Sequence, residues 1–256
     1  MMKHRLFLLV LLVFVLLCGC AADWDVQAVD STVDIGDYVF CVEEATGDRY
    51  NVRVSYSIKR RDGGDINPNI RFGLLTSDDG LRSAGGTIRY SLSDDKKTMW
   101  IVQEQSSSQK FDCDTVHTVV LEDLIFGEDS VTESVEGKWS ATYTIQINDD
   151  YTELITEELK IQILDGNTEY LLSSVQLSTM GIHMEMEVPN NGKDDFIDHF
   201  DAHLIRQDGT CIELEFHHSI RGGKTHYHAT AEAMFKEIIE KDDLYAIVIC
   251  GQEILV

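Results

Sequence analysis

The residues most able to do chemistry are the histidines of segment 216–228, which reads FHHSIRGGKTHYH. Its two adjacent glycines are typical of a two-residue hairpin turn. Such a turn places position 217 opposite 228 and position 219 opposite 226. One face of the hairpin then presents three histidines and two glutamates, namely His217, His226, His228, Glu213 and Glu215.

Imidazole nitrogens and a carboxylate oxygen are ligands that Zn²⁺ binds tetrahedrally in proteins. The hairpin therefore predicts a metal site formed by His217, His226 and His228. The same alternation also fits an ordinary solvated strand face, and a slip of the strand register by one residue would disperse the group. Both interpretations stay open at the level of the sequence.

No other motif indicates catalysis. The chain has no Gly-x-Ser-x-Gly sequence, no phosphate-binding glycine loop and no dinucleotide-binding fingerprint. Adjacent acidic residues occur at 78–79, 94–95, 149–150 and 194–195, but 45 of the 256 residues are acidic, so such pairs are expected by chance. We therefore predict no catalytic residue and no cofactor. A cell-envelope hydrolase that uses these acidic loops is the alternative.

The N-terminal segment has the features of an export signal. Lys3 and Arg5 precede an apolar run that begins at Leu6 and ends in LCGC at positions 17–20. The run is shorter than the ~20 residues that span a bilayer, so residues 1–19 are predicted to be a signal peptide. The LCGC ending resembles a bacterial lipoprotein lipobox, in which Cys20 receives the lipid. A plain signal peptide cut at an A-x-A-like site is the alternative.

Lipidation at Cys20 implies a protein anchored in the cell membrane on its extracytoplasmic face, with membrane lipid as its first partner. Residues 20–30 would form the lipidated cysteine and a short polar tether. The net charge of −24 argues against nucleic acid as a partner, because phosphate backbones are bound by clustered Lys and Arg.

Four cysteines remain after export and lipidation, and they allow three disulfide connectivities. Disulfides persist outside the cytoplasm. Two cysteines lie in each half of the chain, so the most economical pairing joins Cys41 to Cys113 and Cys211 to Cys250. Four buried thiols are the alternative, because free cysteine also packs as a small apolar residue.

Alternation of apolar and polar residues predicts an all-β fold. It is clearest at 50–58, 139–147 and 182–188, and Asp-Gly and Gly-Gly turn signals separate the runs. The parity of Met184 and Met186 predicts that both belong to a strand core. Segment 229–241 fits either a helix or a strand that leads into a single helical turn at 241–244. Such strands without crossover helices favour antiparallel sandwiches, with domains at 31–148 and 149–256.

The chain resembles a family of paired extracytoplasmic domains of unknown function found in Gram-positive anti-sigma-factor-like membrane proteins. The matching residues are VDIG (33–36), the strand 50–58, GKW (137–139), VQLS (175–178), MGI (180–182), QDGT (207–210) and AIVICGQEIL (246–255). The resemblance implies two immunoglobulin-like β-sandwich domains in tandem. It supplies no catalytic residues, and the sigma-binding segment and membrane helix of the family have no counterpart before residue 20.

Together these features predict a non-enzymatic, surface-anchored lipoprotein that acts as an extracytoplasmic binding or sensing module. Its further partner would be another membrane or cell-envelope protein. A metal- or ligand-binding lipoprotein that uses the histidine face is the first alternative, and the hydrolase is the second.

Overall fold

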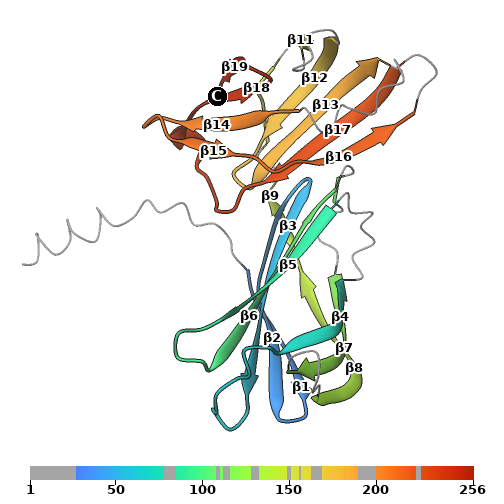
Figure 1. Cartoon of the computed structure of the whole chain (residues 1–256), viewed down its shortest axis with the longest axis vertical. Coiled ribbons are helices and arrows are strands. Elements are labelled where there is room, and N and C mark those ends of the chain that lie inside the picture. The colour runs from blue at the N-terminus through green and yellow to red at the C-terminus, as the bar shows by residue number, and fades with distance from the viewer. Residues whose placement is uncertain are drawn as a thin grey trace, which may run out of the picture.

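The computed structural model describes residues 27–77, 85–107, 110–111, 116–127, 133–148, 151–155, 157–162, 169–189, 200–222 and 226–256. These residues form β-strands almost throughout, so the predicted all-β fold is confirmed (Figure 1). The one helical element among them is a single 3₁₀ turn, η1 (Lys241–Asp243). The described residues contain no helix long and apolar enough to cross a membrane. The predicted signal peptide and Cys20 lie outside them.

The N-terminal half folds into two sheets. The larger has the order β1-β2-β3-β6-β5, and β9 pairs in parallel with β2. Its strands are β1 (Gln27–Ile35), β2 (Tyr38–Asp48), β3 (Asn51–Arg60), β5 (Gly85–Leu92), β6 (Thr98–Ser106) and β9 (Gln146–Asn148). The smaller has the order β4-β7-β8, with β4 (Arg71–Ser77), β7 (Val116–Phe126) and β8 (Glu133–Thr144). β1 begins inside the predicted tether, because residues 27 and 28 already pair with β2.

The apolar faces of these two sheets enclose one core. The core face predicted at 50–58 is confirmed from position 52, because Val52, Val54, Tyr56 and Ile58 of β3 are all buried in this core, whereas Tyr50 packs on His183. The ring of Phe40 in β2 stacks on Tyr56 at 5.2 Å between centroids. Alternation therefore selects the buried face here, as expected for a strand with one face on a core.

The C-terminal half is a second pair of sheets. The larger has the order β10-β12-β13-β17-β16, with β11 on β12, and the smaller has the order β15-β14-β18-β19. The larger comprises β10 (Thr152–Glu153), β11 (Leu159–Gln162), β12 (Glu169–Leu177), β13 (Gly181–Pro189), β16 (His217–Arg221) and β17 (His226–Met234). The smaller comprises β14 (Ala202–Arg206), β15 (Cys211–Glu213), β18 (Leu244–Ile249) and β19 (Gln252–Leu255).

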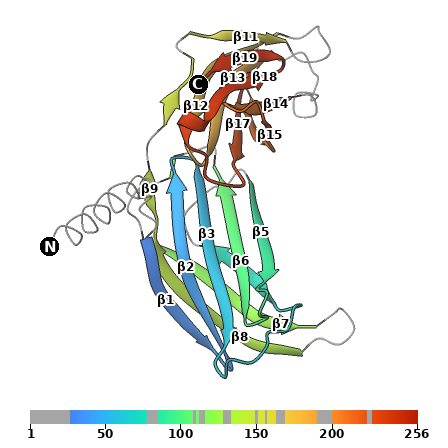
Figure 2. The same ribbon diagram turned by 90° about the vertical axis from the view of Figure 1, so that its left-hand side faces the viewer.

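The second core is separate from the first. Its residues run from Leu154 to Ile254, whereas those of the first run from Val33 to Ile147. Met184 and Met186 are fully buried in it, which confirms that these methionines are strand core. Figures 1 and 2 show the two sandwiches stacked along the long axis of the molecule.

Segment 229–241 is not an extended helix. It continues β17 to Met234 and reaches the single turn η1 at Lys241, so the strand alternative is confirmed. The backbone N–H groups of Phe235 and Ile239 donate to the carbonyls of Met180 and Thr179, at 2.8 and 2.9 Å. These bonds to a neighbouring turn replace the i→i−4 bonds that a helix would need.

The cysteines do not form the C-terminal disulfide predicted above. Cys211 and Cys250 are both free thiols. Cys211 pairs with Ile205 near one end of β14, while the N–H of Cys250 bonds to Asp201 before the other end. Four residues of strand separate these points by about 13 Å, beyond the ~7 Å that a disulfide bridges. The Cys41 thiol contacts the carbonyl of Val42, and Cys113 lies outside the described residues.

Candidate functional site at the interdomain cleft

The two domains are joined through a buried carboxylate, that of Asp48 at the end of β2. It accepts hydrogen bonds from the backbone N–H groups of Tyr50, at 2.8 Å, and Asn51, at 2.7 Å. The hydroxyl of Ser178, in the turn between β12 and β13, donates to its Oδ2. The Tyr151 hydroxyl also bonds to Asp48. One side chain of the first domain is thus held by two segments of the second.

Burial raises the pKa of Asp48 above its ordinary value, and the hydrogen bonds from Ser178 and Tyr151 act against this rise. The pKa of Tyr151 is also raised, first by burial and then by the charge of Asp48, so its hydroxyl keeps the proton that it donates. The Tyr151 ring meets Tyr50 edge to face, with centroids 5.5 Å apart.

A second contact covers part of the outer face of the larger C-terminal sheet. The ring of Tyr50 stacks on His183 at 3.8 Å and 6°. His183 is 1 % exposed, and its Nδ1 lies 3.4 Å from Oε1 of Glu232, which is fully buried. Within the described part of the chain, neither carboxylate oxygen of Glu232 has a hydrogen-bond partner. This outer strand face is therefore an interface between domains.

A third contact is made by Arg53 of β3. Its guanidinium donates to the backbone carbonyl of Phe235 in the second domain and, through Nε, to Oε1 of Glu104 at 2.9 Å. Oε2 of Glu104 forms an ion pair with the guanidinium of Arg89 at 2.7 Å and accepts a hydrogen bond from the hydroxyl of Thr87 at 3.2 Å. The strand register places Arg53, Glu104 and Thr87 side by side across three strands.

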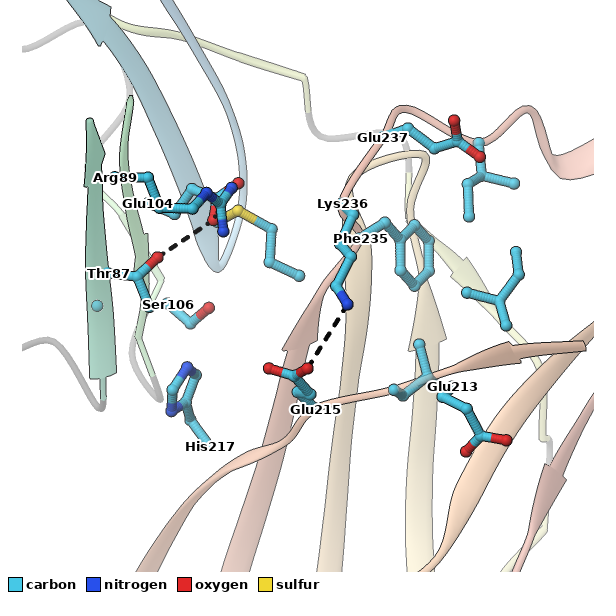
Figure 3. Close-up of a pocket in the computed structure, with 15 residues that line it drawn as sticks. Thr87, Arg89, Glu104, Ser106, Glu213, Glu215, His217, Phe235, Lys236 and Glu237 are labelled. Carbon is cyan, nitrogen blue, oxygen red and sulfur yellow. Dashed lines mark hydrogen bonds and ion pairs between the residues drawn. The ribbon is translucent and has the colours of Figure 1, made fainter. Parts of the chain in front are cut away.

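Beside these contacts the domains enclose a cleft of about 330 Å³ (Figure 3). One wall is formed by β5 and β6, and the other by the segment that joins β15 to β16 and by the end of β17. Its lining residues are Gly86, Thr87, Arg89, Glu104, Ser106, Ile212, Glu213, Leu214, Glu215, His217, Met234, Phe235, Lys236, Glu237 and Ile239.

The cleft combines apolar and charged side chains. Ile212, Leu214 and Phe235 pack on the second core and supply apolar lining. Glu215 and Lys236 form an ion pair of 3.6 Å, and both side chains are more than four-fifths exposed. Figure 3 shows this pair facing Thr87 and Ser106 across the space. A volume of this size at a domain boundary is typical of a small-molecule or peptide site.

The predicted histidine site is not assembled. His217 pairs with Glu232 and Arg221 with His228, so the predicted register is wrong by four residues. β16 ends at Arg221 and β17 begins at His226, so the strand ends do not flank a two-residue turn at 222–223. His217 and His228 share a face but lie four positions apart, or about 13 Å, which exceeds the span of a metal site.

The three predicted ligands have different surroundings. His217 lines the cleft with Glu213 and Glu215, and His228 lies opposite Glu187. The backbone of His226 pairs with Pro189. The described residues contain no group of three or more His, Cys, Asp or Glu side chains that could hold a metal ion.

No sequence motif indicates the other half of the site. Thr87, Arg89 and Glu104 lie in ordinary alternating strands, more than a hundred positions before Glu215. Only the docking of the domains brings these segments together. The polar residues His183 and Glu232 fit a solvated face by their alternation, and the first domain covers that face.

Comparison with known proteins gives a fold and no family. No family model matches the chain, and no match was found among the curated proteins. The fold is similar to the crystal structure of a conserved domain protein from Bacillus anthracis, with a TM-score of 0.59 and 12 % sequence identity. That match covers 88 % of this chain and 76 % of the other, so the likeness extends over both domains.

Proposed function

We propose that this protein is a lipid-anchored, non-enzymatic binding or sensing module of the extracytoplasmic membrane face, built from two immunoglobulin-like sandwich domains. Its ligand site would be the interdomain cleft. The observation that carries the proposal is that both domains line this cleft, while contacts at the buried Asp48 and at the partly buried Arg53 hold them together. A fixed cleft between domains needs little reordering when it binds a ligand.

The chemistry of the cleft favours binding over hydrolysis. Glu104 is held by two arginines and a threonine, and Glu215 faces Lys236. Both of these carboxylates are therefore engaged with cations of the protein, and no pair of free, convergent carboxylates of the kind that a glycosidase uses is seen among the described cleft residues. Of the acidic loops, Asp95 has a lowered pKa because Ser93 and the N–H of Lys97 donate to it, which is the pattern of a turn.

The test is proximity labelling on intact cells with the full lipidated protein. Glu215→Trp fills the cleft from an exposed position, and Glu253→Trp places the same bulk on β19, away from it. We expect the wild type and Glu253→Trp to label the same envelope proteins, and Glu215→Trp to lose them. Identical labelling by all three proteins would refute the cleft as the binding site.

A further inference from the structure

We propose that the cleft binds an extended peptide segment of a cell-envelope protein, which adds as a strand to the free edge of β5 and carries alternating basic and apolar residues. This inference rests on the proposed function and specifies its ligand. Three observations lead to it: the edge itself, the way it opens into the cleft, and the side chains on each side of it.

β5 is the last strand of its sheet, and β6 is its one partner among the described strands. The pairing runs without a register shift from Gly85 with Ser106 to Leu92 with Met99. Residues 86–91 are all exposed. Alternate N–H and C=O groups of such a strand point away from its neighbour, where another strand can pair with them.

Other edges of the two large sheets are less suited to strand addition. β1, at the opposite edge of the same sheet, contains an irregularity between Ala28 and Ser31. β16 has five residues and β10 has two. Proteins protect their edges with irregularities and short strands. β5 has eight residues and an unbroken register, so it has neither of these two protections.

The N-terminal end of β5 opens into the cleft. Gly86, Thr87 and Arg89 line it from one side, and Glu213 and Glu215 line it from the other. A strand added to β5 would therefore run along the first domain and enter the cleft at Gly86. Its side chains on the Thr87 face would meet the segment between β15 and β16.

The two faces of β5 favour different types of residue on the added strand. On the cleft face, Arg89 forms an ion pair with Glu104. Glu215 pairs only with Lys236, and solvent-exposed ion pairs of this type contribute little energy. Glu213 has no ion pair in the part of the chain that the structure describes. The cleft face therefore favours basic side chains.

The opposite face of β5 exposes two large apolar side chains, Ile88 at 41 % and Tyr90 at 38 %. Cross-strand pairs of aromatic or β-branched residues stabilise a sheet, so this face favours apolar neighbours. Successive residues of a strand point to opposite faces, which makes the pattern of the ligand alternate. A second copy of this chain is a poor occupant, because its net charge of −24 would be repelled.

The probe is a capped, fluorescent octapeptide of alternating lysine and valine, titrated against the full lipidated protein in detergent micelles and followed by anisotropy. Controls are the glutamate–valine octapeptide and a lysine–valine octapeptide with alternate backbone amides N-methylated. We expect each control to bind at least about tenfold more weakly, the first for its charge and the second for its lost edge hydrogen bonds.

On the protein side, Glu215→Lys reverses a charge of the cleft, and Glu253→Lys is its matched control. The first should weaken binding about tenfold and the second should leave it unchanged. Equal binding of the methylated peptide, or equal effects of the two variants, would overturn strand addition. Loss of labelling by Glu215→Trp would still support the cleft itself. A concentration-dependent dimer abolished by Ile88→Lys would also overturn the proposal, since a second copy would then occupy the edge.

Discussion

Removing the hydroxyl of Ser178 should separate the contribution of the domain contact from that of the two cores. This hydroxyl donates to Asp48 across the interface, and its oxygen accepts the backbone N–H groups of Met180 and Gly181, each at 3.0 Å. Ser178 is 2 % exposed, so water does not replace these partners in Ser178→Ala. The bond to the carboxyl group is worth about 1 to 3 kcal/mol, and each buried N–H without a partner costs about 1 kcal/mol.

The expected loss in the free energy of unfolding is therefore about 3 to 5 kcal/mol. Urea denaturation followed by circular dichroism measures it at neutral pH. The matched control is Ser173→Ala on β12, whose exposed hydroxyl donates to the carbonyl of Glu185 at 3.0 Å. Exposed substitutions of this kind usually change stability by less than about 0.5 kcal/mol. Equal losses for the two variants would refute the role given to the Asp48 contact.

Three further outcomes are expected. The pKa of Asp48 is raised in the folded protein, so Asp48 stays protonated there to a higher pH than in the unfolded chain. The free energy of unfolding should therefore fall as pH rises from 3.8 through the raised pKa. Asp48→Asn should remove this slope, measured between pH 4 and 7. Gly181→Ala should destabilise by about 1 to 3 kcal/mol in urea, because the new Cβ would lie 2.5 Å from a backbone carbonyl, whereas Gly222→Ala has ordinary contacts and serves as control. Cys20→Ala should abolish labelling by radioactive palmitate, and retained label would refute lipidation there.

The sequence predicts most strands of this protein because each has one face on a core. The apolar residues of 52–58 and 182–188 all lie on the buried core face, as their alternation predicts. The register of β16 on β17 was not predictable in the same way. A two-residue turn and a longer connection leave the parity of His217 and His228 unchanged, so alternation cannot distinguish them. The register is determined by the packing of the whole sheet, which the local sequence pattern does not contain.

The interface escaped prediction for a related reason. His183 and Glu232 occupy polar positions of alternating strands, which indicates solvent when a single domain is considered. The first domain covers part of this face with the ring of Tyr50, while the face itself keeps polar side chains such as His183 and Glu232. Composition therefore does not distinguish such an interface from a solvated surface. The cleft forms only when the domains dock, so its residues could not be predicted from the sequence either.

The topology also relates the predicted anchor to the cleft. The chain enters its first sheet through β1, while the proposed ligand strand would pair with β5 at the opposite edge. Four strand spacings separate these edges by about 19 Å. A lipid on Cys20 would thus hold the protein by one edge of this sheet and leave the other open to an envelope protein. Binding at β5 would add to the sheet without displacing β1, so anchoring and ligand binding can occur together. In that arrangement the tether limits how far the cleft reaches from the membrane, and partners fixed in the envelope near the membrane become the ones that the protein can meet.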